Sequence, residues 1–238
     1  MATTALFSET DLTSDDYRSV LSRLTEEYAV RPLSGQPETG ELLLRHDVSL
    51  SLSDAETMAE VEADNGVRAT YCLMLSSPLF NSLDGNQRAR IRKIESYGHE
   101  IGLLFSTHDY WEETPGEAEL EEEISKQLSV LDVVVDEPSP VVGFHRPPSY
   151  VQGRQFSEFR NALAPEYTSE ITYVDDRVRA GEKNQSSEQP ESVHLLVHPA
   201  LWMSSASEYE RKIEQSVIES CRYVNRRARA EFVDPQRQ

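Results

Sequence analysis

Apolar residues along the chain follow two alternating patterns. Short continuous apolar runs are typical of strands buried on both faces, and the segments between them place apolar residues three and four positions apart, as amphipathic helices do. The predicted strands are residues 42–48, 67–75, 99–106, 141–145, 169–174 and 192–198. The predicted helices are residues 11–28, 51–65, 87–97, 115–133, 156–163 and 205–232.

The regular alternation of strands and helices predicts an α/β fold. With about six to seven strands, it favours a parallel sheet wound by helices and closed, or nearly closed, as a deformed (β/α) barrel. Residues 31–40, with two prolines and two glycines, form a predicted loop. Residues 177–191 are polar and lack periodicity, so they form a second predicted loop, either a lid or a disordered segment.

Composition limits the classes of partner. The chain has 238 residues and a formal net charge of −19, with the acidic residues spread along its length. Such a charge suits a high-salt interior, where screening reduces self-repulsion, and we expect a halophilic source. It disfavours nucleic-acid binding, which needs clustered basic residues. The sequence has no apolar stretch of about 20 residues and no secretory signal, so we expect no membrane span and a cytoplasmic location.

The two cysteines, Cys72 and Cys221, lie far apart and lack the spacing of a zinc motif. We expect both to be buried thiols, one in a strand and the other in a helix.

Polar residues with catalytic potential follow five of the predicted strands. Because parallel strands present their carboxyl ends at one edge, these side chains should meet there. They are Asp47, the segment Ser106-Thr107-His108-Asp109, the pair His145-Arg146, the pair Asp175-Asp176, and His198. Any one of them could be a helix cap or a loop hydrogen bond, but five together favour a functional site.

Five segments carry a family resemblance in their order and spacing. They are Leu44-Arg45-His46-Asp47-Val48, Gly66-Val67-Arg68-Ala69-Thr70-Tyr71, Gly98-His99-Glu100-Ile101-Gly102, Phe144-His145-Arg146-Pro147-Pro148 and Leu196-Val197-His198-Pro199. Through residues 41–203 the chain resembles the polysaccharide deacetylases of the NodB-homology type. This family implies a deformed (β/α) barrel that removes N- or O-acetyl groups from sugars with a divalent metal, usually zinc. It divides the chain into a helix and linker at residues 1–40 and a deacetylase-like barrel domain at residues 41–238.

The resemblance implies a role for each matched residue. Asp47 matches the general base that activates water, and Arg146 matches the arginine that keeps this base ionised by a paired charge. His198 matches the general acid that protonates the leaving group. Asp176 looks like the acid that orients this histidine, with Asp175 as the competing choice.

The implied metal site departs from the family pattern. The family binds its metal through an Asp two residues after the base and two His four residues apart; here these positions are Ser49, Leu104 and His108. A serine hydroxyl is a poor ligand and leucine is none, so only His108 remains of three ligands. His145 or Asp109 could refill the site. His46 should point away from Asp47, because side chains alternate along a strand.

Three functions remain open at this level. The chain is a polysaccharide deacetylase-like protein with weakened or lost metal-dependent hydrolase activity, or a deacetylase of an intracellular sugar with a rebuilt metal shell or a metal-free route. Alternatively, it is a non-catalytic carbohydrate-binding or regulatory partner of an active paralogue. The expected ligand is an acetylated sugar or a glycan precursor. In a purely structural interpretation, Asp47 and Arg146 form a buried ion pair and Leu104 fills the former metal pocket.

Overall fold

One parallel sheet organises the molecule. The computed structural model describes residues 13–177, 190–206 and 208–234, so most of the predicted loop 177–191 lies outside the described residues. The strands are β1 (Ala29–Arg31), β2 (Glu41–Val48), β3 (Thr70–Leu73), β4 (Glu100–Phe105), β5 (Pro138–Phe144), β6 (Arg160–Asn161), β7 (Thr172–Asp175) and β8 (Val193–Val197). Their order is β6-β5-β4-β3-β2-β8-β7, with β1 paired to β2, and all the pairings are parallel.

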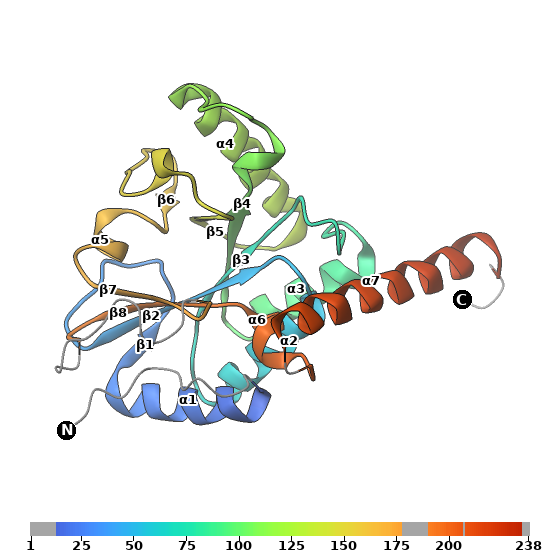
Figure 1. Ribbon diagram of the computed structural model, residues 1–238, viewed down its shortest axis with the longest axis horizontal. Coiled ribbons are helices and arrows are strands. Elements are labelled where there is room, and N and C mark those ends of the chain that lie inside the picture. Colours follow the sequence, from blue (N-terminus) through green and yellow to red (C-terminus); the bar gives the residue numbers. More distant parts are fainter. Residues whose placement is uncertain (1–12, 178–189, 207, 235–238) are drawn as a thin grey trace.

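The helices are α1 (Ser14–Glu27), α2 (Leu52–Asp64), α3 (Gly85–Ser96), α4 (Glu117–Val134), α5 (Pro165–Thr168), α6 (Pro199–Met203) and α7 (Tyr209–Phe232). Helices α1, α2, α3, α4 and α6 contribute to the main core on the convex face of the sheet, whereas α5 places Tyr167 in the apolar cluster on the concave face (Figure 1). Helix α1 begins with a capping box between Thr13 and Asp16 and buries Tyr17, Leu21 and Leu24 in the main core. The N-terminal helix therefore packs on the same core as the barrel strands.

The two faces of the sheet contain different residues because side chains alternate along each strand. On β2, Leu42, Leu44 and Val48 belong to the core beneath the helices. Leu43 belongs to a second apolar cluster on the concave face. Arg45 and Asp47 share the parity of Leu43, so their charged groups also lie on the concave face.

The sheet curls strongly enough for distant strands to approach each other. The guanidinium of Arg45 on β2 packs against Gly143 on β5, although β3 and β4 lie between these strands. Residues 33–35 help to close the barrel between its edge strands. The Tyr167 hydroxyl of α5 donates to the Gly35 carbonyl at 3.0 Å, and the Arg160 guanidinium of β6 donates to the Ser34 carbonyl. The result is a curled, incompletely closed parallel barrel, as the strand–helix alternation predicts.

Several local predictions were wrong. Residues 156–163 do not form a helix. Instead, Arg160–Asn161 form the short strand β6, and the Asn161 amide donates to the carbonyls of Val151 and Arg154 at 2.8 and 2.7 Å. Side-chain hydrogen bonds of this kind compete with helix formation. Strand β1 lies at the junction of the predicted helix, which ended at residue 28, and the predicted loop, which began at residue 31. Helix α6 precedes a closing helix that begins only at Tyr209.

The expectation for the cysteines holds for only one of them. Cys72 is buried in the concave cluster, where burial raises its pKa to about 12. Cys221 is exposed, because it lies on the outer side of α7. Within the described residues, no helix is long and apolar enough to cross a membrane.

Candidate functional site

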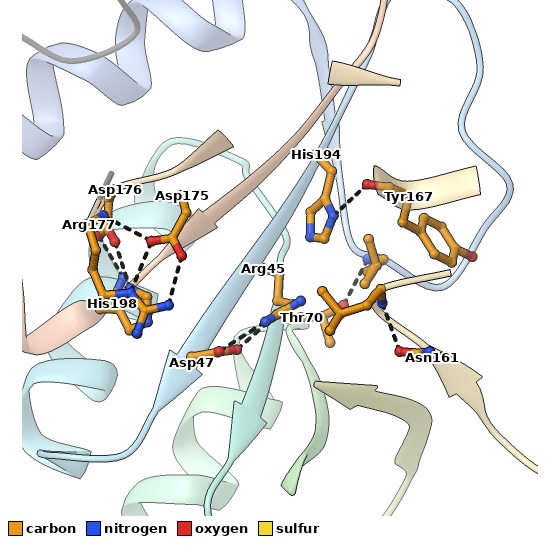
Figure 2. A network of polar contacts seen from close by, with 12 residues as sticks. Arg45, Asp47, Thr70, Asn161, Tyr167, Asp175, Asp176, Arg177, His194 and His198 are labelled. Carbon is orange, nitrogen blue, oxygen red and sulfur yellow. Dashed lines mark hydrogen bonds and ion pairs between the residues drawn. The ribbon is translucent and has the colours of Figure 1, made fainter. Parts of the chain in front are cut away.

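Four of the predicted strand-end residues, Asp47, His145, Arg146 and His198, line a cleft of about 290 Å³ at the carboxyl edge of the sheet. Asp47 and Ser49 reach it from the end of β2, Arg146 from the end of β5, and Arg177 and His198 from beyond β7 and β8. In Figure 2 the side chains of Asp175, Asp176, Arg177 and His198 gather at one edge, with Asp47 and Arg45 beside them. This volume is near the lower end of the range for small-molecule sites, roughly 300–1,000 Å³.

His198 is held by a fully buried carboxylate. Asp176 accepts the Nδ1–H of His198 at 2.6 Å, and its other oxygen accepts the His198 backbone N–H at 2.8 Å and the Trp202 indole N–H at 2.9 Å. Burial lowers the pKa of His198, but attraction and hydrogen bonding to Asp176 outweigh it, so the pKa is raised above 6.5. Such a pair orients an imidazole and stabilises its protonated form, which a general acid requires.

Asp175, the competing choice for this role, has a different partner. Its carboxylate accepts hydrogen bonds from the backbone and guanidinium of Arg177 at 2.8–3.1 Å. Burial raises the pKa of Asp175, but these bonds to Arg177 hold it below its ordinary value. The structure therefore brings Asp176, and not Asp175, against the Nδ1 atom of His198.

Asp47 is paired within its own strand. Arg45 donates from Nε and one terminal nitrogen to the two Asp47 oxygens, at 2.8 and 2.9 Å. The side chains are 1% and 6% exposed. Residues two apart on a strand share a face, and a bidentate pair is the strongest arrangement for these two groups. Burial raises the pKa of Asp47, but the positive charge and hydrogen bonds of Arg45 more than offset this and lower the pKa.

Arg146, which was expected to pair with Asp47, lies exposed at the rim of the same cleft. Its backbone adopts a left-handed φ of 46°, and its carbonyl accepts a hydrogen bond from His108 Nε2 at 3.0 Å. The structure does not bring Arg146 into an ion pair with Asp47, because Arg45 already engages both carboxylate oxygens. Sequence reasoning missed Arg45, although an arginine two places before a buried acid was a usable signal.

The three positions expected to bind metal do not form a ligand set. Leu104 is 1% exposed and packs in the concave cluster with Leu33, Cys72 and Val141. The backbone carbonyl of Ser49 accepts a hydrogen bond from Ser77 at 2.8 Å, and His108 is exposed beside Arg146. With an alkyl group in the second position, these side chains do not fit a divalent cation.

A different cluster has metal-ligand atoms close together. Among the described residues, one group of three or more His, Cys, Asp or Glu side chains has its ligand atoms within 4.8 Å of one another: Asp175, Asp176 and His198. These atoms are already engaged in the ion pairs with Arg177 and within the Asp176–His198 pair. Neither His145 nor Asp109, the expected replacement ligands, belongs to this group.

Positive charge already occupies the interior beside Asp47. The ring of His194 lies near Arg45 on the concave side (Figure 2), and its Nδ1 contacts the Tyr167 carbonyl at 3.0 Å. Burial and the charge of Arg45 lower the pKa of His194 to about 3, so this histidine is neutral. The same burial and the same positive charge of Arg45 also disfavour a divalent cation nearby.

His46 points to the opposite face, as the alternation of β2 predicts. Its Nε2 lies 2.7 Å from the carboxylate of Glu62 on α2, which also accepts the hydroxyls of Tyr17 and Tyr71. All these groups are buried beneath the helices. This polar network was not predicted, because Glu62 lies on a helix with ordinary amphipathic spacing. It connects α1 and α2 to the sheet and is separate from the cleft.

Comparison with known proteins finds similarity in structure only. No protein-family model matches the chain, and no curated protein matches it in sequence. A peptidoglycan N-acetylglucosamine deacetylase is similar in structure, with 17% identity over 84% of this chain and 90% of the other, and a TM-score of 0.46. A family 4 carbohydrate esterase from Bacillus anthracis has 14% identity over 85% of each chain and a TM-score of 0.43. A CE4 family pseudoenzyme from the same organism has 15% identity over 83% and 66% of the two chains, with a TM-score of 0.46. Likenesses this weak say nothing of what this chain binds or catalyses.

Proposed function

We propose that this chain is a polysaccharide deacetylase-like protein that has lost metal-dependent hydrolysis and retains a cleft for an acetylated sugar or glycan precursor. The sequence motifs support the family assignment. The cleft among Asp47, His198 and Arg146 supports a ligand the size of a sugar ring. The observation that supports the loss of activity is the burial of Leu104 at a position where the family has a metal ligand.

The cleft retains a general acid, His198, but among the described residues it has no group that activates water as a nucleophile. In the related enzymes, a divalent metal would lower the pKa of a bound water and polarise the acetyl carbonyl. Here His198, oriented by Asp176, can still donate a proton. Asp47 is ionised, but both of its oxygens accept hydrogen bonds from Arg45, so it is poorly placed to take a proton from water.

The proposal is tested by acetate release and sugar binding, measured on the same protein. Wild type and Asp47→Asn are incubated with acetylated chitin oligosaccharides at several salt concentrations, with zinc, cobalt or nickel added. We expect saturable binding, detected by NMR shifts of His198, and no acetate above the level of Asp47→Asn. Metal-dependent acetate release by wild type that disappears in Asp47→Asn would show that the protein is an active deacetylase.

A further inference from the structure

A trough leads away from the candidate site along α7. The site cleft shares three lining residues, Leu50, Ser51 and Leu79, with a second hollow of about 390 Å³. That hollow shares Arg90, Tyr223 and Arg226 with a third hollow of about 620 Å³. We call the three adjoining hollows the α7 trough. In Figure 1, α7 runs past α2 and α3 and extends outward from the body of the protein.

The trough is long enough for an extended ligand. Helix α7 contributes to all three hollows, from Ile213 beside the site cleft to Ala230 at the far end. At a rise of about 1.5 Å per residue, this wall is roughly 26 Å long. A single sugar ring would occupy only the site end, so the remainder can accommodate further units of the same chain.

The outer two hollows are basic in a strongly acidic protein. They are lined by five basic side chains, Arg90, Lys93, Arg222, Arg226 and Arg227, against two acidic ones, Glu56 and Glu219. The whole chain has a net charge of −19, so this is a local reversal of sign. Clefts lined by one sign of charge attract ligands of the opposite sign.

Two of these arginines remain available to a ligand. Arg90 and Lys93 both contact Glu56, and Arg227 contacts Asp84 at 3.3 Å. Among the ion pairs of the described residues, none involves Arg222 or Arg226, and both side chains are exposed. Their guanidinium groups can therefore form bidentate contacts with a carboxylate without breaking an existing pair.

The other lining residues suit a sugar chain. Hydroxyl and amide side chains lie along the trough, and Tyr223 offers an aromatic ring; these polar residues are Ser51, Ser53, Asn86, Gln87, Ser216 and Ser220. Such groups match the hydroxyls of a glycan. The larger apolar lining residues, Leu50, Leu52, Leu79 and Phe80, belong to the second hollow and not to the third, so no row of apolar anchors for a peptide helix follows the length of the trough. A nucleic acid would need many more phosphate contacts than two available arginines provide.

We propose that the α7 trough binds an acidic glycan, with an acetylated sugar at His198 and carboxylate-bearing units on Arg222 and Arg226. The assignment of the site end rests on the proposed function, but the assignment of the arginines does not. Acidic units distinguish this ligand from a neutral chain of acetylated sugars.

Hyaluronan hexasaccharide is a suitable probe, because it alternates acetylated and carboxylate-bearing sugars. Its affinity is measured by calorimetry beside that of a neutral chitin hexasaccharide. We expect tighter binding of the acidic probe, and a loss of about tenfold in the double variant Arg222→Glu/Arg226→Glu. The matched control Arg211→Glu/Arg229→Glu changes the net charge equally on the same helix but outside the trough, and should stay within about twofold.

Equal loss in the two double variants would overturn the inference, because the effect would then come from overall charge. No preference for the acidic probe, or equally tight and arginine-dependent binding of inorganic polyphosphate, would overturn it as well. In each of these cases, the proposed function of the site still stands if the variant Arg222→Glu/Arg226→Glu binds chitin hexasaccharide. Loss of all sugar binding in wild type would instead contradict the proposed function.

Discussion

Arg45 and Asp47 place two opposite charges inside the curled sheet, where their side chains are 1% and 6% exposed. Removing one partner of a buried pair leaves the other uncompensated, and this costs about 3–5 kcal/mol. Arg45→Met should therefore destabilise the protein by that amount in urea unfolding, and the double variant Arg45→Met/Asp47→Leu should recover most of the loss. Arg146→Ala is the control and should change the free energy of unfolding by less than about 0.5 kcal/mol. A large effect of Arg146→Ala together with a small effect of Arg45→Met would contradict the Arg45–Asp47 pairing.

His198 carries a second prediction, which concerns pH. Because its pKa in the folded protein is raised above 6.5 by Asp176, protonated His198 stabilises the fold fully below pH 6.5. This contribution is lost as the pH rises through the raised value. An NMR titration should place the pKa of His198 above 6.5 in wild type and below it in Asp176→Asn, where burial and the charge of Arg177 outweigh the remaining attraction to Asp47. An unchanged pKa in Asp176→Asn would refute the pairing.

At the residue scale, the sequence was informative about which groups meet and less so about how they pair. The positions of Asp47, Arg146 and His198 at one cleft follow from parallel topology alone. The choice between Asp175 and Asp176 depends on where β7 ends, because adjacent side chains point in opposite directions. The Arg45 pairing was missed because the family resemblance assigned Arg146 as the partner of Asp47, although the alternation of the strand puts Arg45 on the same face as Asp47.

At the element scale, close packing between β4 and β5 shapes the curled sheet. A Cβ atom on Gly102 would lie 2.6 Å from the carbonyl oxygen of Val141, in a region where the β4–β5 register shifts. Gly102→Ala should therefore cost about 1–3 kcal/mol in urea unfolding. Gly85→Ala, at the start of α3 with no atom within 4 Å of its Cβ position, should be neutral or slightly stabilising. Equal effects of the two substitutions would contradict the close packing.

The long elements were predictable because each has a clear hydrophobic period or a continuous apolar run. The short ones were not. Strand β6 has two residues and α6 has five, too few to show a period. Residues 156–163 do not form the predicted helix, because their apolar side chains pack against one another locally. The rings of Phe156 and Phe159, for example, are stacked with centroids 4.5 Å apart. Tertiary contacts determine the conformation of these short segments.

At the scale of the whole molecule, the parallel barrel gathers Asp47, Arg146 and His198 at one edge and fills one expected metal-ligand position with the alkyl side chain of Leu104. Leu104 extends the apolar cluster on the concave face, and Arg45 supplies the positive charge beside Asp47. Residues outside the segments that resemble the family supply the acidic surface and the basic α7 trough. The sequence predicted that Ser49 and Leu104 replace two metal ligands of the family, whereas the trough required the placement of α7.

Calorimetric titration of zinc into the folded protein tests the central claim most directly. Wild type should show no stoichiometric zinc site at the cleft, because Leu104 and Ser49 cannot act as ligands beside His108. The variant Ser49→Asp/Leu104→His should gain one site per chain, provided circular dichroism and urea unfolding show that it remains folded. One equivalent of zinc bound by wild type, and lost on His108→Ala, would contradict the account.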